Sequence, residues 1–242
     1  MALNNSINNT VGGSNTGATN ILTVTNSSDT ASSSSQILSI VGGGSAGDPY
    51  FTAQVNGSGT YSWGVDNSDS DAFVMSLASG VGSNNFMRTN STGEVNWPLQ
   101  AAFLAYLASS DSNVTGSGTF ATLGAATALT EVFDQNSDFN TNGTFTAPIT
   151  GRYRYDSAVD ITGCTVCTGG TIEILTSNRA YRWAFQRVAS ANDFGSELSC
   201  LADMDAADTS VIRVQSNGEA GDTDDIFGNA LLYTFFSGNL VC

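Results

Sequence analysis

The chain has 242 residues and a mass of 25.0 kDa, with 22 acidic against 7 basic residues and a net charge of −15. All seven basic residues are Arg, and the sequence contains neither Lys nor His. These absences exclude a Ser-His-Asp or Cys-His relay, a histidine metal site, a lysine Schiff base and a phosphate-binding lysine. Nucleic acid is excluded as a partner because phosphate binding requires clustered cations. We therefore expect a structural or binding protein and not an enzyme.

The composition predicts an all-β protein. Charged residues make up 12% of the chain, about half of the ~25% that is typical of globular proteins. Gly, Ser, Thr and Asn take their place, whereas 40% hydrophobic content argues against disorder. Short β-branched runs between turn-forming clusters are typical of strands. No apolar stretch approaches the ~20 residues of a transmembrane helix, and the N-terminus lacks the features of a secretory signal, so we expect no membrane insertion.

Residues 1–98 are poor in large apolar side chains. They hold seven of the aromatic residues and one Arg, Arg88. We expect an extended, Asn-rich N-terminal arm at residues 1–24 and a β-rich shaft at residues 25–98. The predicted strands are residues 21–25, 36–41, 50–55, 61–65, 72–77 and 94–99. Because ordering the backbone costs about 1–2 kcal/mol per residue, a single copy would struggle to offset that cost, and we expect partner copies to complete a trimeric shaft.

Residues 99–242 carry sixteen aromatic residues and six Arg, and we expect them to form a separate C-terminal head. Segment 151–161 alternates, with Tyr153 and Tyr155 on one face and Arg152 and Arg154 on the other, which predicts a half-buried antiparallel strand. Residues 171–175 place Glu173 on the face opposite Ile172 and Ile174. Further strands are predicted at residues 103–107, 131–134, 143–146, 180–189, 210–215 and 230–236. Many short strands without a helical period predict a sandwich or jelly roll.

Two glycine-rich motifs overlap after an apolar run. Gly42, Gly44 and Gly47 satisfy GxGxxG, but a dinucleotide-binding turn requires a following helix, and the sequence continues into another predicted strand. Gly43, Ser45 and Gly47 satisfy the GxSxG pattern of a nucleophile elbow, which requires a His that this chain does not have. We interpret this segment as a flexible turn.

Three aspartate clusters carry the oxygen ligands that calcium prefers. They are Asp66/Asp69/Asp71, Asp203/Asp205/Asp208 and Asp222/Asp224/Asp225. None completes an EF-hand loop, and solvated turn residues are the alternative interpretation for all three. The best calcium candidate is the last cluster, because three carboxylates crowd into four positions. We assign no catalytic or cofactor-binding residue and no established metal site.

The four cysteines are Cys164, Cys167, Cys200 and Cys242. The first two form a CxxC, the spacing of a redox pair or of half a zinc site. A zinc ribbon requires a second CxxC, and a thioredoxin-type motif opens a helix, whereas this motif lies in a predicted loop. A local disulfide and free thiols both remain open.

The C-terminal half resembles the globular-head domain of complement C1q. The segment EVFDQNSDFNTNGTFTAPITGRYRYDSAVDI, residues 131–161, is similar to the central signature of that family, with F-T-A-P at 145–148 and G-x-Y-x-Y at 151–155. AAFLAYL at 101–107 is similar to its opening strand, and the closing segment FFSGNLVC has Asn239 where the family usually has an aromatic residue. Asp208, before the strand at 211–214, matches the turn that precedes this segment.

This resemblance implies a ten-stranded jelly roll of the kind that tumour-necrosis-factor ligands share, assembled as a homotrimer that binds through surface loops. It carries no catalytic residue over. Some members of the family hold calcium, but their ligands have no match here. The Asn/Ser/Thr/Gly-rich first half, with DNSDSDAF at 66–73 and the lead-in GEVNWPLQAAFLAYL, resembles the fibre and spike proteins of tailed bacteriophages.

We therefore expect a homotrimeric fibre or spike at the virion surface. Its arm would contact other virion proteins, and its head would bind a host-surface glycan or protein. The alternative is a capsid or tail decoration protein that cements neighbouring subunits without binding a receptor. A third interpretation is a polysaccharide-degrading tailspike, in which paired carboxylates would cleave the sugar chain. Such enzymes usually require a longer β-helical body than 98 residues.

Overall fold

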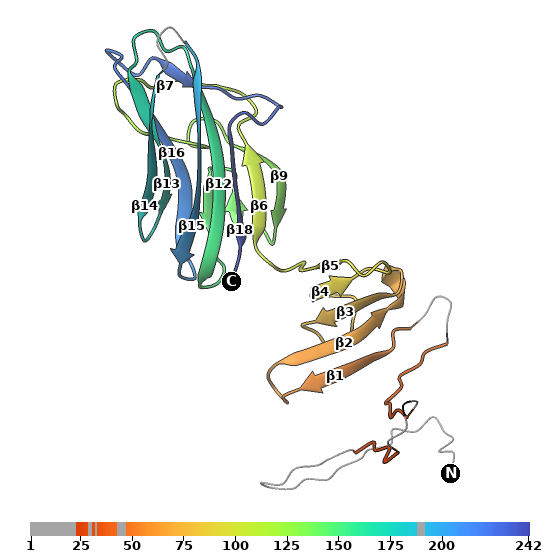
Figure 1. The fold of residues 1–242 in the computed structure, drawn as a ribbon. Helices are drawn as coiled ribbons and strands as arrows, with labels where there is room; N and C mark the ends of the chain where they lie inside the picture. The colour runs from red at the N-terminus through yellow and green to blue at the C-terminus, as the bar shows by residue number, and fades with distance from the viewer. Residues whose placement is uncertain (1–22, 29–30, 32, 43–46, 188–191) are drawn as a thin grey trace.

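The computed structural model describes residues 23–28, 31, 33–42, 47–187 and 192–242. Figure 1 shows two β units, a small N-terminal sheet and a larger head built from two sheets. The head is the predicted all-β unit, and the only helical element of the described chain is a single 3-10 turn at Asn67–Asp69. No helix in the described ranges is long and apolar enough to cross a membrane.

The N-terminal sheet is a five-stranded antiparallel meander in the order β1-β2-β3-β4-β5. Its strands are β1 (Tyr50–Gln54), β2 (Thr60–Asp66), β3 (Ala72–Ser76), β4 (Asn85–Thr89) and β5 (Val95–Asn96). The alternation of the strands turns small residues such as Ser62, Ala72 and Val74 to the buried face. The larger Trp63 and Phe73 occupy the other face and stay exposed. One copy of this sheet thus buries very little apolar surface.

Several predictions for the first half need correction. Residues 23–25 and 36–41 form no strand, although strands were predicted at 21–25 and 36–41. Their apolar side chains have no partner strand, and Ile37, Leu38 and Ile40 are exposed. Strand β4 was not predicted, because its sequence NFMRT does not alternate. Residues 1–22, which include most of the expected arm, and Gly43, Gly44 and Ser45 of the glycine motifs lie outside the described residues.

The head consists of a seven-stranded and a six-stranded antiparallel sheet. The seven-stranded sheet contains β6 (Ala102–Tyr106), β7 (Asp111–Thr115), β9 (Thr130–Gln135), β12 (Gly151–Thr162), β15 (Phe194–Met204), β17 (Asp224–Ile226) and β18 (Phe235–Leu240). The six-stranded sheet contains β8 (Ala121–Thr122), β10 (Phe139–Asn140), β11 (Thr144–Thr146), β13 (Gly169–Thr176), β14 (Ala180–Gln186) and β16 (Thr209–Asn217).

The strand order defines a jelly roll. Strands β6, β18, β12 and β15 are neighbours in one sheet, and β11, β16, β13 and β14 are neighbours in the other. If these eight strands are counted along the chain, the two orders are 1-8-3-6 and 2-7-4-5, which is the pattern of two interlocked Greek keys. The head has thirteen strands in place of the expected ten, because short strands such as β7, β8 and β17 are added to this frame.

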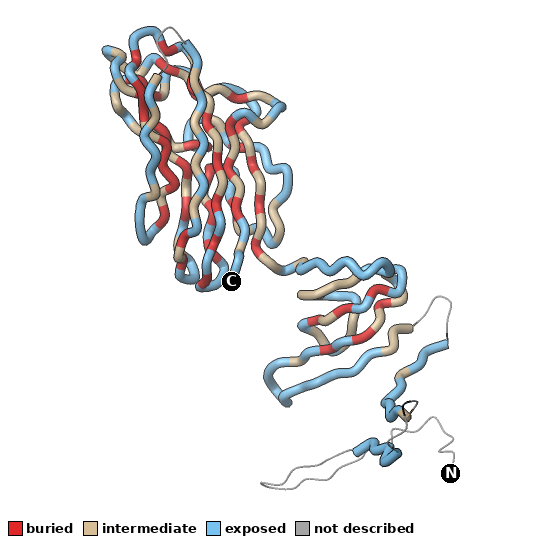
Figure 2. The backbone as a smooth tube through the Cα atoms, viewed as in Figure 1, coloured by how far each residue is buried: buried red, intermediate tan, exposed pale blue. Residues whose placement is uncertain are grey.

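The core lies between the two sheets and is rich in aromatic rings. Phe103 of β6 stacks on Phe139 and Phe145 with ring centroids 4.6 and 4.9 Å apart, and it meets Phe236 of β18 edge to face at 4.9 Å. Buried and outward residues alternate along β12, as predicted (Figure 2). Tyr153 is among the fully buried side chains. Large rings at alternate positions of facing strands therefore fill the sandwich.

The final strand lies later in the chain than predicted. Residues 230–236 were expected to form it, but β18 spans Phe235–Leu240. Leu232 has a positive φ of 57°, which interrupts the extended backbone of a regular strand, and Leu231 is exposed. The apolar run at 231–233 thus belongs to a loop on the surface of the head.

The segment between the two units is held against the head at one end of the sandwich. Gln135 donates from Nε2 to the carbonyls of Trp97 and Gln100, both at 2.7 Å, and Asn136 donates to the carbonyl of Leu99 at 2.8 Å. The C-terminus of the chain lies at the same end of the sandwich (Figure 1). The opposite end of the sandwich, which we call the distal end, carries the loops 107–110, 116–120, 163–168, 218–223 and 227–234.

Candidate functional site

The solvent side of the seven-stranded sheet, which we call the open face, has an apolar hollow. Leu104 of β6 lies between Phe133 of β9 and Ser237 of β18 in the strand register, so these side chains share one face. Together with Leu232 and Phe235 they line a pocket of about 390 Å³. Phe133 is 49% exposed. An apolar hollow on a sheet that packs its other side on the core is typical of a protein-binding surface.

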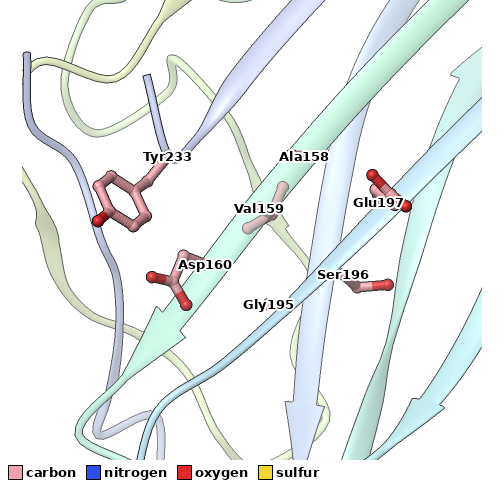
Figure 3. Close-up of a pocket in the computed structure, with 7 residues that line it drawn as sticks. All are labelled: Ala158, Val159, Asp160, Gly195, Ser196, Glu197 and Tyr233. Carbon is pink, nitrogen blue, oxygen red and sulfur yellow. The ribbon is translucent and has the colours of Figure 1, made fainter. Parts of the chain in front are cut away.

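A second hollow of about 410 Å³ follows β12 and β15 on the same face (Figure 3). Asp160 and Tyr233 lie on one side of β12, and Glu197 of β15 lies on the other. Partial burial, with a smaller effect from the charge of Asp193, raises the pKa of Asp160. A third hollow of about 330 Å³ adjoins these residues and includes Phe235. The open face thus carries a continuous row of depressions with apolar and acidic walls.

The three candidate calcium ligands of the distal end do not converge on one point. Asp222 accepts hydrogen bonds from the amide and hydroxyl of Ser117, which hold the pKa of its carboxyl below the usual range. Asp225 accepts a 2.7 Å bond from the amide of Asn113. Asp224 is fully buried and accepts a 2.6 Å bond from the hydroxyl of Ser216. Each carboxylate therefore fixes a different segment of the chain.

The other two aspartate clusters have structural partners. Asp66 caps the 3-10 turn by accepting from the amide of Ser68, and Asp69 pairs with Arg88. Asp203 pairs with Arg179 at 2.5 Å. Asp208 accepts from Asn178 at 2.9 Å and from the amide of Asp205 at 2.8 Å. Each of these four carboxylates thus has a partner within the chain, and Asp203 lies in strand β15 and not in a turn.

The CxxC lies in the distal loop 163–168, where Cys164 and Cys167 form a disulfide with Cα atoms 5.6 Å apart. Glu219, from the neighbouring loop, accepts hydrogen bonds from the amides of Thr165 and Val166, both at 2.7 Å. One ligand atom from each of Cys164, Cys167, Glu219 and Asp224 lies within 4.8 Å of the others. The sequence did not bring these four residues together, because their loops meet only through the fold.

The remaining cysteines lie elsewhere and are free thiols. Cys200 of β15 is half-buried, and burial raises the pKa of its thiol to about 11. Cys242 is exposed at the chain terminus. Neither thiol belongs to the four-residue cluster of the distal end.

The outer face of the six-stranded sheet contains a charged cluster that the sequence did not reveal. Glu173 of β13 lies on the outward side, as predicted, but its side chain is fully buried. Arg182 and Arg213 from the two neighbouring strands both bind its carboxylate. The Phe120 ring covers them, with the Arg213 guanidinium 4.9 Å and the Arg182 guanidinium 5.8 Å from its centroid. This cluster carries a net positive charge on an otherwise acidic head.

The head is similar in fold to several solved jelly-roll proteins. No protein-family model and no curated protein sequence matches the chain. The zebrafish complement C1qA globular domain is 14% identical, covers 59% of this chain and 98% of its own, and has a TM-score of 0.40. Murine APRIL is 10% identical over 59% of this chain and 99% of its own, with a TM-score of 0.41. The PRD1 vertex protein P5 is 10% identical over 60% of this chain and 99% of its own, with a TM-score of 0.41. The assignment of the chain as an all-β protein with a jelly-roll head rests on its own strands and their order.

Proposed function

We propose that this protein is a homotrimeric fibre or spike component of a virus particle whose head binds a receptor on the host surface. The observation that carries the proposal is the open face. Its apolar hollow lies on a sheet whose inner side already packs on the core, which leaves the hollow available to a further partner. A second copy of the same head offers the same chemistry, and burying apolar surface between copies drives association.

The N-terminal sheet supports the same assembly. Phe51 and Trp63 stack on its exposed face with ring centroids 6.2 Å apart, and Tyr61 and Phe73 lie on the same face. Five strands with so small a buried core gain most of their stability from partners. Aromatic faces from three copies would form a common core, as expected for a trimeric shaft. In this arrangement the N-terminal arm contacts other virion proteins.

The distal end is the part of the head that is best placed for recognition. The chain enters the head at the opposite end, so the distal loops project away from the shaft. Hydrogen bonds to carboxylates connect these loops to one another. Asp222 accepts from the hydroxyl of Ser117, and Glu219 accepts from the amide of Thr165. Rigid loops lose little entropy on binding, and three heads on one fibre add avidity when their geometry allows simultaneous contact. Because the protein has a net charge of −15, it gains nothing from attraction to a negatively charged cell surface. We therefore expect its loops to recognise the receptor through hydrogen bonds and aromatic side chains.

Adsorption of the virus to susceptible cells tests this proposal. The purified full-length chain should compete with particles for host receptors and reduce the adsorption rate in proportion to its occupancy. A serum albumin at equal concentration should leave that rate unchanged. If the chain occupies sites between capsid subunits in particle images and never competes, the protein is a cement component and the receptor-binding proposal is wrong.

A further inference from the structure

The four-residue cluster of the distal end combines two thiol and two carboxylate ligands from separate loops. Cys164 and Cys167 follow β12, Glu219 follows β16, and Asp224 begins β17. Both cysteines and Asp224 are buried, whereas Glu219 is partly exposed. The separation of at most 4.8 Å between their ligand atoms is close to the ligand spacing of a metal centre.

One oxygen of Asp224 has no hydrogen-bond partner. Oδ2 accepts from Ser216, but Oδ1 is buried without a donor among the described residues. A buried carboxylate oxygen without a partner is costly, and cations are among the groups that remove this cost. Burial and the nearby charges of Glu219 and Asp225 raise the pKa of this carboxyl, whereas Arg187 lowers it. Oδ1 of this buried side chain therefore remains available to a cation.

We propose that Cys164, Cys167, Glu219 and Asp224 bind one thiophilic divalent cation of the zinc class when the two cysteines are in the dithiol form. Zinc accepts thiolate and carboxylate ligands in a tetrahedron, with bonds of about 2.3 Å to sulfur and about 2.0–2.2 Å to oxygen. Such a tetrahedron has edges of roughly 3.3–3.8 Å, so the cluster has to contract by about 1 Å. Calcium does not fit this site, because it prefers six to eight oxygen ligands.

The surrounding backbone preassembles the site. The amides of Thr165 and Val166 already orient the Glu219 carboxylate toward the cysteine loop. Gly218 has a φ of +114°, and a Cβ at that position would lie 3.0 Å from the Cα of Cys167. The two loops are therefore in direct backbone contact, which places the four ligand side chains close together before a metal binds.

The disulfide and the metal are alternative ways to fix the cysteine loop. A thiol reductant supplies two electrons and two protons, or a phosphine supplies the two electrons while water supplies the two protons and the oxygen of the phosphine oxide, and the S–S bond breaks to give two thiols. Binding of Zn²⁺ then releases both thiol protons, and any proton held by Asp224, as two metal–sulfur bonds form. The disulfide closes the loop 163–168 in an oxidising medium, whereas in a reducing one the cation would join that loop to Glu219 and Asp224.

Metal analysis of the full-length chain tests the proposal directly. The chain is reduced with a phosphine, incubated with Zn²⁺ and dialysed against metal-free buffer, and its zinc content is measured by mass spectrometry. We expect one zinc per chain and a higher Tm. After oxidation to the disulfide we expect no retained zinc. Co²⁺ in place of Zn²⁺ should give the near-ultraviolet thiolate-to-cobalt absorption that reports on sulfur ligation.

Matched variants separate this site from incidental binding. Asp224→Asn keeps the shape of the side chain and should weaken zinc binding at least tenfold, as should Cys164→Ser. Cys200→Ser removes a half-buried thiol of a different strand and should leave the stoichiometry unchanged. The proposal is overturned if the reduced chain keeps no zinc, if Co²⁺ gives no thiolate absorption, or if Asp224→Asn binds zinc as tightly as the unmodified chain.

Discussion

The Glu173 carboxylate accepts a 2.7 Å hydrogen bond from Nε of Arg213, which lies 40 positions further along the chain on the neighbouring strand. Arg182 binds the same carboxylate from the strand on the other side. Because the Phe120 ring covers both guanidinium groups, an acidic residue on the solvent side of a sheet becomes fully buried. This ion cluster joins β16, β13 and the edge strand β14 of the six-stranded sheet.

Replacing Glu173 with Gln should therefore destabilise the head. The variant leaves two cations without their shared anion, and breaking a buried ion pair costs about 3–5 kcal/mol. Since both arginines reach solvent, we expect a smaller loss of about 1–3 kcal/mol in the free energy of unfolding. Urea unfolding at fixed chain concentration measures it. Asp203→Asn, which breaks the exposed pair with Arg179, is the control and should cost at most about 1 kcal/mol.

The aromatic core predicts a larger effect for Phe103→Ala. Phe103 touches three other rings and is fully buried, so its truncation leaves a cavity between the two sheets. We expect a loss of about 3–5 kcal/mol in the free energy of unfolding. Trp183→Ala removes a large ring that is 60% exposed and should cost less than about 1 kcal/mol. Equal losses for the two variants would show that the core does not lie between the sheets.

Two aspartates of β12 should change stability in opposite directions with pH. Burial and Asp193 raise the pKa of Asp160 above its ordinary 3.8, so the folded chain binds that proton more tightly than the unfolded chain. The stabilisation is complete below pH 3.8 and is lost as the pH rises through the raised pKa. Asp160→Asn should therefore raise the Tm at pH 7 and have no effect on it at pH 3.

Asp156 provides the matched comparison. The Arg154 hydrogen bond lowers its pKa below 3.8, so its stabilisation is present above pH 3.8 and is lost as the pH falls through the lowered pKa. Asp156→Asn should lower the Tm at pH 7, with a cost of about 0.2–1 kcal/mol for this exposed pair. Thermal melts of both variants between pH 3 and pH 7 check the two signs. Shifts of the same sign at pH 7 would contradict the assignment.

Self-association through the open face should be sensitive to a single added charge. Phe133 is 49% exposed in one copy, so Phe133→Asp should leave the fold of the head intact. In the proposed trimer the new carboxylate would be buried in an apolar contact, and we expect the oligomer to dissociate. Trp183→Asp places the same charge at an exposed position of the edge strand β14, which belongs to the other sheet, and should leave the oligomer unchanged. Light scattering after size-exclusion chromatography distinguishes the two results.

The sequence was most informative where one strand has one buried and one solvent face. The alternation along β12 predicted the inward positions of Tyr153 and Tyr155, because a period of two fixes the side of each residue. Contacts between strands could not be predicted, because they depend on the order of the strands in the sheet. Glu173 meets Arg182 and Arg213 only because β14 and β16 flank β13, and no local pattern contains that information.

Apolar runs were the main source of wrong strand predictions. Residues 36–41 and 230–236 have the composition of strands, but the first segment has no partner strand. Residues 230–234 of the second segment form a loop beside the open face, before β18 begins at Phe235. Composition cannot distinguish a strand that is buried within one chain from an apolar segment at the surface. The sequence identified Asp224 and the CxxC as separate candidate ligands. It did not predict that their loops lie side by side in the fold, so the four-residue cluster was not predicted.

Sedimentation equilibrium of the full-length chain at micromolar concentration tests the central claim, self-association through the open face, most directly. The trimer predicts a mass of about 75 kDa, three times that of the 25.0 kDa chain. The Phe133→Asp variant should sediment as a single chain under the same conditions. A mass of 25.0 kDa for the unmodified chain over this concentration range would contradict the account.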